Sequence, residues 1–225
     1  MKRDEFWYRT SDGLNLFARI WAPEGSVKGV VVLVHGLGEY GGRYTAIGDS
    51  FVDRGYVFVA GDLRGHGVSE GRRAFVARLD NFMDDLDRYC DEIRRRFPGK
   101  PLFLYCFSMG STLGAAYLIR RHPHLAGAIL LSGGFVTPPA SAAAMGKVKA
   151  LRLVVPTLAV RNGMGPNRGK VCHDVTVLDA YDADPLVYKK ITIGLTAVFL
   201  DANAEILARA GEIQVPLLVM HGEDD

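Results

Sequence analysis

This sequence is poor in cysteine, in long apolar runs and in net charge, and each shortage excludes a class of protein. Its three cysteines, Cys90, Cys106 and Cys172, show no C-x-x-C spacing and favour free thiols in a reducing compartment. No apolar run is long enough to cross a bilayer, and MKRDEFWYRT lacks the apolar segment of a secretory signal. A net charge of +2 gives no reason to expect nucleic acid as a partner. We therefore expect a cytoplasmic protein, with peripheral contact to a membrane surface left open.

The 225 residues instead carry a pattern of short apolar runs that alternate with helical segments. FWYRTSDGLNLFARIWAP predicts a β-hairpin, because Ser11-Asp12-Gly13 is a turn signal between two strand-like runs. In residues 79–97 the apolar positions recur at helical spacing. Five nearly continuous apolar runs are typical of strands buried on both faces: 30–34, 57–60, 102–107, 128–131 and 217–220. The alternation predicts an α/β fold with a doubly wound, mostly parallel sheet.

The alternation breaks after Ser132, where an irregular segment begins. We expect a helical cap at residues 133–184, lying over the carboxyl edge of the sheet, between two core parts at 1–132 and 185–225. Between Phe135 and His173 the cap contains no acidic residue. Its basic residues are Lys147, Lys149, Arg152, Arg161, Arg168 and Lys170. They form either an ordinary solvated face or a basic, apolar cap that settles on anionic lipid surfaces.

One serine stands where a strand is expected to end and a helix to begin, in LFLYCFSMGSTLGAAYL. Ser108 is either a buried hydroxyl at the strand end or a nucleophile held on a tight strand-to-helix turn. The S-x-G pattern alone is weak evidence, but the small residues that follow suit the close strand–helix approach of such a turn. The helix N-terminus would also direct free N–H groups toward the serine.

The glycine-rich stretch HGLGEYGGRY follows the first buried strand and predicts the second part of an acyl-transfer site. Two N–H donors must face a developing oxyanion, and we expect them to be the backbone groups of Leu37 and Met109. His35 is expected to bond loop backbone instead of acting as a base. In GDLRGHGVSEG, we expect Asp62, Arg64 and His66 to hold the loop together, with His66 as general base the rival interpretation.

HGLGEYGGRY, GDLRGHGVSEG, SMG, DADPLVY and PLLVMHGEDD follow one another in the order found in α/β-hydrolases. The chain resembles the monoacylglycerol lipase and lysophospholipase group of serine hydrolases over its whole length. The resemblance implies an esterase that cleaves single-chain lipid esters through an acyl-enzyme, beneath a mobile lid. It implies Ser108 as nucleophile and Leu37 and Met109 as the oxyanion donors, with a small lipid ester as substrate and no metal or organic cofactor.

The resemblance also assigns roles to three further residues. It places the catalytic acid on Asp225, with Asp224 as the fallback; otherwise both are simple turn carboxylates. Glu39 and Arg43 match positions that neighbour the polar head of the substrate in related enzymes. The other interpretation of Glu39 and Arg43 is an ordinary ion pair at a helix start.

The sequence departs from the family pattern in two places. Cys106 stands where the usual G-H-S-M-G-G motif begins with glycine, and we interpret it as a small buried hydrophobe, a redox-sensitive thiol being the alternative. All six histidines precede Asp225, whereas the family base follows the acid. We therefore expect the final strand–helix unit and the base to be missing, and residues 1–225 alone to be inactive. A peptidase or an acyltransferase of the same fold, or a non-catalytic ligand-binding protein, remains the alternative.

Overall fold

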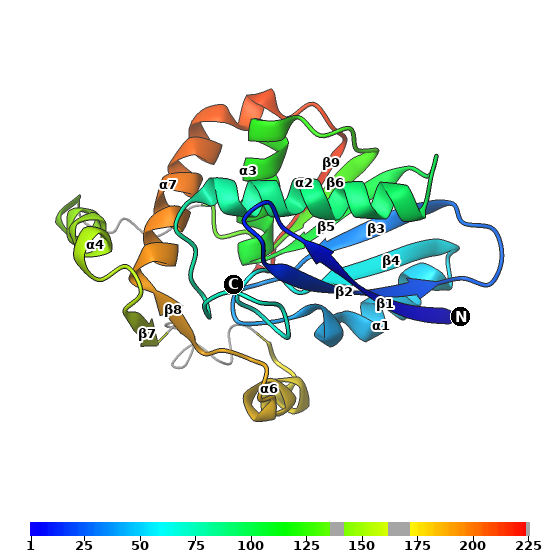
Figure 1. Cartoon of the computed structure of the whole chain (residues 1–225), viewed down its shortest axis with the longest axis horizontal. Helices are drawn as coiled ribbons and strands as arrows, with labels where there is room; N and C mark the ends of the chain where they lie inside the picture. Colours follow the sequence, from blue (N-terminus) through cyan, green and yellow to red (C-terminus); the bar gives the residue numbers. More distant parts are fainter. Residues whose placement is uncertain (136–141, 162–171, 224–225) are drawn as a thin grey trace.

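The computed structural model describes residues 1–135, 142–161 and 172–223, which form a central sheet covered by helices (Figure 1). The main sheet has seven strands in the order β1-β2-β4-β3-β5-β6-β9. The strands are β1 (Lys2–Arg9), β2 (Asn15–Ala22), β3 (Gly29–Val34), β4 (Tyr56–Gly61), β5 (Leu102–Phe107), β6 (Gly127–Leu131) and β9 (Leu217–Met220). β2 runs antiparallel to both its neighbours, and the pairings from β4 to β9 are parallel. The predicted hairpin and mostly parallel sheet are confirmed.

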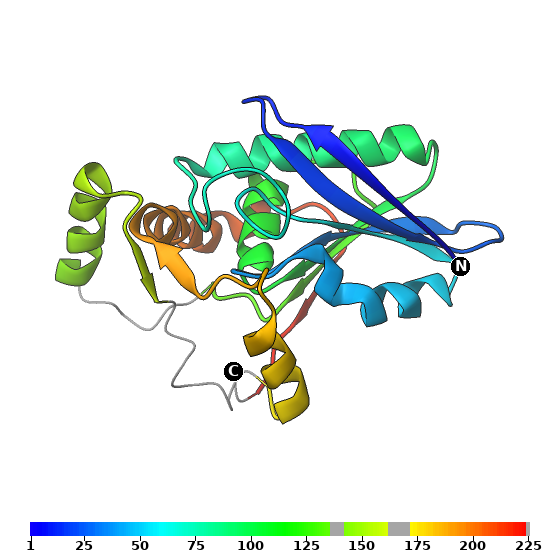
Figure 2. The ribbon, with the colours of Figure 1, turned by 60° about the horizontal axis from the view of Figure 1, so that its bottom comes forward.

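Helices cover both faces of this sheet, as a doubly wound fold requires (Figure 2). α2 (Leu79–Arg96), α3 (Met109–Arg121) and α7 (Ile193–Arg209) lie on one face, over the larger apolar cluster. α1 (Thr45–Val52), preceded by the 3₁₀ turn η1 (Gly41–Tyr44), lies on the other face with a smaller cluster. β5 joins the two layers, because its alternate side chains Leu104 and Cys106 pack into the first cluster and Phe103 and Tyr105 against the second.

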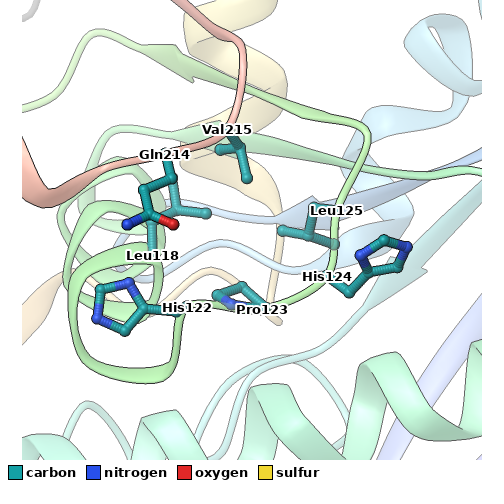
Figure 3. Close-up of a pocket in the computed structure, with 7 residues that line it drawn as sticks. All are labelled: Leu118, His122, Pro123, His124, Leu125, Gln214 and Val215. Atoms are coloured by element: carbon teal, nitrogen blue, oxygen red, sulfur yellow. The ribbon is translucent and has the colours of Figure 1, made fainter.

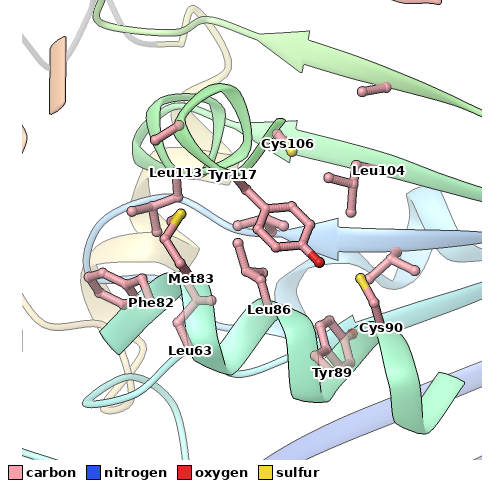
Figure 4. Packing of buried hydrophobic residues seen from close by; sticks show 14 of the residues in the cluster. Leu63, Phe82, Met83, Leu86, Tyr89, Cys90, Leu104, Cys106, Leu113 and Tyr117 are labelled. Carbon is pink, nitrogen blue, oxygen red and sulfur yellow. The ribbon is translucent and has the colours of Figure 1, made fainter. Parts of the chain in front are cut away.

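The helix predicted at residues 79–97 forms α2 and buries its apolar stripe against α3 and the sheet (Figure 4). Phe82, Leu86, Tyr89 and Ile93 recur every three or four residues and are at most 1% exposed. The last turn carries three arginines, which complement the negative end of the helix dipole. The helix ends before the Pro98-Gly99 pair, as the sequence predicts.

The inserted segment is partly helical, with α4 (Ala142–Val154) and α6 (Val175–Ala183) as its helices in the described ranges. It also contains a feature that the sequence pattern did not predict: β7 (Ala159–Arg161) pairs antiparallel with β8 (Lys190–Thr192). Strands of three residues are too short to show an alternation of apolar and polar residues, so the sequence pattern could not predict them. Because β8 lies beyond residue 184, a cap that ends at residue 184 includes β7 but not its partner β8. The predicted cap at residues 133–184 therefore corresponds to the helices α4 and α6 and not to this strand pair.

The far edge of the sheet is exposed. Among the described residues, β9 pairs with β6 alone, and its four residues are between 40% and 57% exposed. A short 3₁₀ turn, η2 (Ala210–Glu212), precedes it. Within the described ranges, no helix combines the length and apolar character needed to cross a bilayer.

Candidate active site

Ser108 occupies a strained turn between β5 and α3. Its backbone has φ 52° and ψ −117°, which a residue with a side chain rarely adopts and which costs about 1–3 kcal/mol. Two hydrogen bonds hold it: the Ser108 N–H donates to the Leu131 carbonyl at 2.9 Å, and the Ser111 N–H donates to the Ser108 carbonyl at 2.9 Å. The side chain is half-buried, and its hydroxyl forms no hydrogen bond to the described residues. The turn therefore presents the hydroxyl at the carboxyl edge of the sheet.

Glycines permit the close approach of α3 to the strands on either side of this turn. A Cβ on Gly110 would overlap the Val34 carbonyl of β3, so this position requires glycine. A Cβ on Gly114 would overlap the Sγ of Cys106. The thiol at position 106 thus fills space that glycine at 114 leaves open. This pair explains how the elbow accepts cysteine in place of glycine without a positive φ.

Cys106 has the environment of a core residue. It is fully buried in the apolar cluster around α3, and burial raises the pKa of its thiol well above the ordinary value. A buried thiol that stays protonated is a poor nucleophile and a poor redox sensor. The geometry therefore favours the small-hydrophobe interpretation over the redox-sensitive one.

The two predicted oxyanion donors lie on neighbouring strand ends. β3 and β5 are parallel partners, so the loop after β3 and the turn after β5 meet at one edge of the sheet. A Cβ on Gly36 would lie 3.4 Å from the Ser108 Cβ, which places the residue before Leu37 against the serine. In the described part of the chain, neither the Leu37 N–H nor the Met109 N–H donates a backbone hydrogen bond. The two N–H groups therefore stay the predicted oxyanion donors.

Glu39 lies near the serine, and Arg43 lies against Glu39. A Cβ on Gly36 would be 2.6 Å from the Glu39 Oε1 and 3.4 Å from the Ser108 Cβ. The Glu39 Oε2 is 3.7 Å from the Arg43 Nε, and the two side chains are only 15% and 17% exposed. Burial raises the pKa of Glu39 to about 7, although Arg43 acts in the opposite direction. Arg43 also faces Asp184 at 3.6 Å and the ring of Tyr181 at 4.9 Å. An ordinary solvated helix-start pair does not describe this arrangement.

The two histidines nearest the motifs bond backbone. The His35 Nε2 accepts the Leu63 N–H at 3.0 Å, so its Nδ1–H donates to the Gly36 carbonyl at 2.8 Å. The His66 Nδ1 bonds the Arg64 carbonyl at 3.0 Å. Burial lowers the pKa of His35 to about 4 and that of His66 to about 3. Neither ring bonds to Ser108, so the rival interpretation of His66 as general base gains no support from this geometry.

Asp62 and Arg64 hold the surrounding loops, as predicted. The Asp62 Oδ1 accepts the Gly41 N–H and an Arg19 N–H, both at 2.8 Å. Arg64 is 6% exposed and makes two bonds to the Asp85 carboxylate, at 2.5 and 2.7 Å. Arg19 and Asp85 were not predictable as loop anchors from the sequence, because their positions on β2 and α2 carry no local motif.

The predicted acid Asp225 and the fallback Asp224 lie outside the described residues, as do Arg168 and Lys170 of the basic cap. His221 follows β9, is exposed, and bonds the neighbouring Gly222 carbonyl at 3.0 Å. Over the described ranges, no group of three or more His, Cys, Asp or Glu side chains could hold a metal ion.

A cavity of about 290 Å³ opens elsewhere, at the C-terminal end of α3 (Figure 3). It is lined by Leu118, His122, Pro123, His124, Leu125, Gln214 and Val215. Ser108 precedes the other end of the same 13-residue helix, roughly 20 Å away at 1.5 Å per residue. This cavity is therefore separate from the serine site.

Comparison with known proteins points to one family. The family model described as serine aminopeptidase, S33, matches residues 25–225. The chain is 32% identical over 221 residues to monoglyceride lipase of Homo sapiens, covering 96% of this chain and 71% of that one. It is 31% identical to monoacylglycerol lipase of Mycolicibacterium smegmatis, with coverages of 99% and 79%. The crystal structure of Paleococcus ferrophilus monoacylglycerol lipase superposes with a TM-score of 0.78 at 26% identity, covering 99% of this chain and 78% of that one.

Proposed function

The chain belongs to the α/β-hydrolase family described as serine aminopeptidase, S33, and from that premise we propose that it is a serine hydrolase that cleaves carboxylic esters of single-chain lipids. Monoacylglycerols and lysophospholipids are the substrate types. The single observation that carries this proposal is the strained Ser108 turn beside two unbonded N–H groups. A strained serine at the turn from a strand into a helix supports the assignment of Ser108 as the nucleophile.

The reaction proceeds in two steps through an acyl-enzyme. The Ser108 Oγ attacks the ester carbonyl and gives its proton to a general base, while the N–H groups of Leu37 and Met109 hold the oxyanion. The ester C–O bond then breaks, the alcohol leaves with a proton, and water hydrolyses the acyl-serine. The described residues supply no base in contact with Ser108, and Asp225 stays the predicted acid.

Glu39 and Arg43 form the proposed site for the polar head of the substrate. Glu39 contacts the same glycine as Ser108, Gly36, and Arg43 lies against Glu39; both side chains are mostly buried. A carboxyl group and a guanidinium together can accept from and donate to the hydroxyl groups of a glycerol head. Substituting Arg43 with Met should therefore raise KM for monoacylglycerol more than KM for p-nitrophenyl butyrate, which has no such head.

Contact with an anionic lipid surface is proposed for the cap helix α4. Leu153 and Val154 at its end are 85% and 79% exposed, and Lys147 on the same helix is exposed. A helix that carries exposed apolar side chains together with an exposed lysine favours the interface of an anionic membrane. Sedimentation with phosphatidylserine vesicles should fall for Leu153→Ser/Val154→Ser; equal sedimentation would contradict this contact. A cytoplasmic location stays a prediction from the unpaired cysteines.

A fluorophosphonate probe tests the nucleophile directly. The protein expressed from its full reading frame should acquire one label, located on Ser108 by mass spectrometry, and Ser108→Ala should remain unlabelled. Ser111→Ala is the matched control, because the Ser111 hydroxyl bonds the Cys106 and Leu131 carbonyls and does not face a substrate. An unlabelled wild type would favour the non-catalytic alternative.

A substrate panel tests the bond that is cleaved. Monoacylglycerols and p-nitrophenyl esters should be hydrolysed, whereas an amino-acid p-nitroanilide should not. Faster cleavage of the p-nitroanilide would favour the peptidase alternative. Transfer of the acyl group to an added alcohol in preference to water would favour the acyltransferase.

A further inference from the structure

The loop beside Ser108 contacts a segment far away in the sequence. We use glycine loop for residues 36–44 and return segment for residues 184–188, which lead from α6 back to the core. α6 lies beside the ribbon that enters α1 (Figure 2). The two segments meet through one side-chain cluster and one backbone contact. Neither contact belongs to the serine turn itself.

The side-chain cluster centres on Asp184, at the C-cap of α6. Its Oδ2 accepts the Tyr40 hydroxyl at 2.9 Å and lies 3.6 Å from the Arg43 Nη1. Its Oδ1 accepts the Leu186 N–H at 2.9 Å, which orders the start of the return segment. The side chain is only 16% exposed. One carboxylate thus bonds the glycine loop with one oxygen and the return segment with the other.

The backbone contact involves Tyr188 and Gly38. The Tyr188 N–H donates to the Gly38 carbonyl at 2.9 Å. Gly38 has φ 73°, and a Cβ there would overlap the Tyr188 carbonyl, so the two backbones touch. Gly38 directly follows Leu37, the proposed oxyanion donor. A glycine-rich loop is conformationally free, and this contact limits that freedom next to the donor.

We propose that Asp184 is a positioning residue: through Tyr40 and the return segment it holds the glycine loop in the conformation that aims the Leu37 N–H at the substrate oxygen. The inference rests on the proposed hydrolase function for its kinetic consequence. Displacing an oxyanion donor lowers kcat, and misplacement by about 1 Å can cost up to about 100-fold in rate. The carboxylate of Asp184 in this way joins the end of the cap to the glycine loop.

Asp184→Asn tests the contact with little change in shape. Asparagine keeps the Oδ1 that accepts the Leu186 N–H, but loses the Oδ2 acceptor for Tyr40 and the charge facing Arg43. Tyr40→Phe removes the same bond from the other side and leaves Asp184 intact. Asp201→Asn is the matched control, because Asp201 pairs with Lys149 and Arg152 between α7 and the cap, away from the glycine loop.

Hydrogen exchange measures the loop without relying on activity. In Asp184→Asn and Tyr40→Phe, the Tyr188 amide and the glycine-loop amides should exchange at least about tenfold faster, and Asp201→Asn should leave them unchanged. With p-nitrophenyl butyrate, kcat should fall about 10-fold at unchanged KM in both variants, and their double mutant should fall no further.

Unchanged exchange in both variants would overturn the proposal, as would normal kcat despite faster exchange. Equal changes in the Asp201→Asn control would also overturn it, by showing a general loosening of the cap. Failure of the proposed function can be told apart from failure of this inference. If the wild type has no serine-dependent esterase activity, exchange of the Tyr188 amide still measures whether Asp184 holds the glycine loop.

Discussion

Replacing Glu39 with Gln should remove a pH dependence of stability that the folded structure creates. The carboxyl is nearly buried beside Ser108, and burial raises its pKa from 4.5 to about 7. Because the folded state holds this proton more tightly than the unfolded chain, stability from this group is present below pH 4.5. It is lost progressively as pH rises from there through about 7.

The size of the effect follows from the shift. Raising the pKa of Glu39 from 4.5 to about 7 corresponds to about 3 kcal/mol of unfolding free energy in total, at 1.36 kcal/mol for each pKa unit. Between pH 5 and pH 8, wild type should lose about 2.5 kcal/mol of unfolding free energy relative to Glu39→Gln. With a urea m-value of about 2 kcal/mol/M, the midpoint of wild type relative to Glu39→Gln should move by roughly 1 M.

The assay is urea denaturation followed by circular dichroism at several pH values from 5 to 8. Wild type should lose stability relative to Glu39→Gln as pH rises, since the variant has no proton to release. Glu70→Gln is the control: hydrogen bonds from Asn15 lower the pKa of Glu70 below 4.5, so the stability that Glu70 contributes is almost complete at pH 5 and changes little up to pH 8. Its curve should run parallel to wild type. Parallel curves for Glu39→Gln as well would refute the reasoning that burial controls this carboxyl.

Three further predictions concern the packing that supports the site. Gly110→Ala should destabilise the fold by about 2 kcal/mol or more, because the added methyl overlaps a β3 carbonyl; an unchanged urea midpoint would contradict this. Asp85→Asn should cost about 2 kcal/mol in urea unfolding, because it removes the buried carboxylate that pairs with Arg64 and leaves the more exposed Asp12 as the remaining charge partner; a loss below about 1 kcal/mol would show that the Asp85 pair is dispensable. A disulfide reagent should modify the half-exposed Cys172 in the native protein and all three cysteines only in urea, so rapid native modification of three would contradict the burial of the others.

Much of the fold was predictable because its signals are local. The buried parallel strands are short continuous apolar runs. α2 has a periodic apolar stripe, an acidic residue in its first turn that suits the helix dipole, and Pro98-Gly99 just after its end. The Ser108 turn was predictable for the same reason, since strand, serine and small-residue helix follow one another directly. His35 as a backbone ligand, and Asp62 and Arg64 as loop anchors, also agree with the structure.

The relations between distant residues had no such signal. The β7–β8 pair joins two three-residue strands across about 30 residues, and the contact of Asp184 with Tyr40 spans 144 positions. The raised pKa of Glu39 is likewise a property of burial and not of its neighbours in sequence.

The sequence by itself therefore determined where the strands of the main sheet, α2 and α3 lie along the chain, the turn that holds Ser108 and the family to which the chain belongs. Only the tertiary structure decided which carboxylates face the glycine loop, and why cysteine is accepted at position 106. The physical reason is that apolar periodicity and turn chemistry act over a few residues, whereas burial and charge pairing depend on which segments the completed sheet brings together.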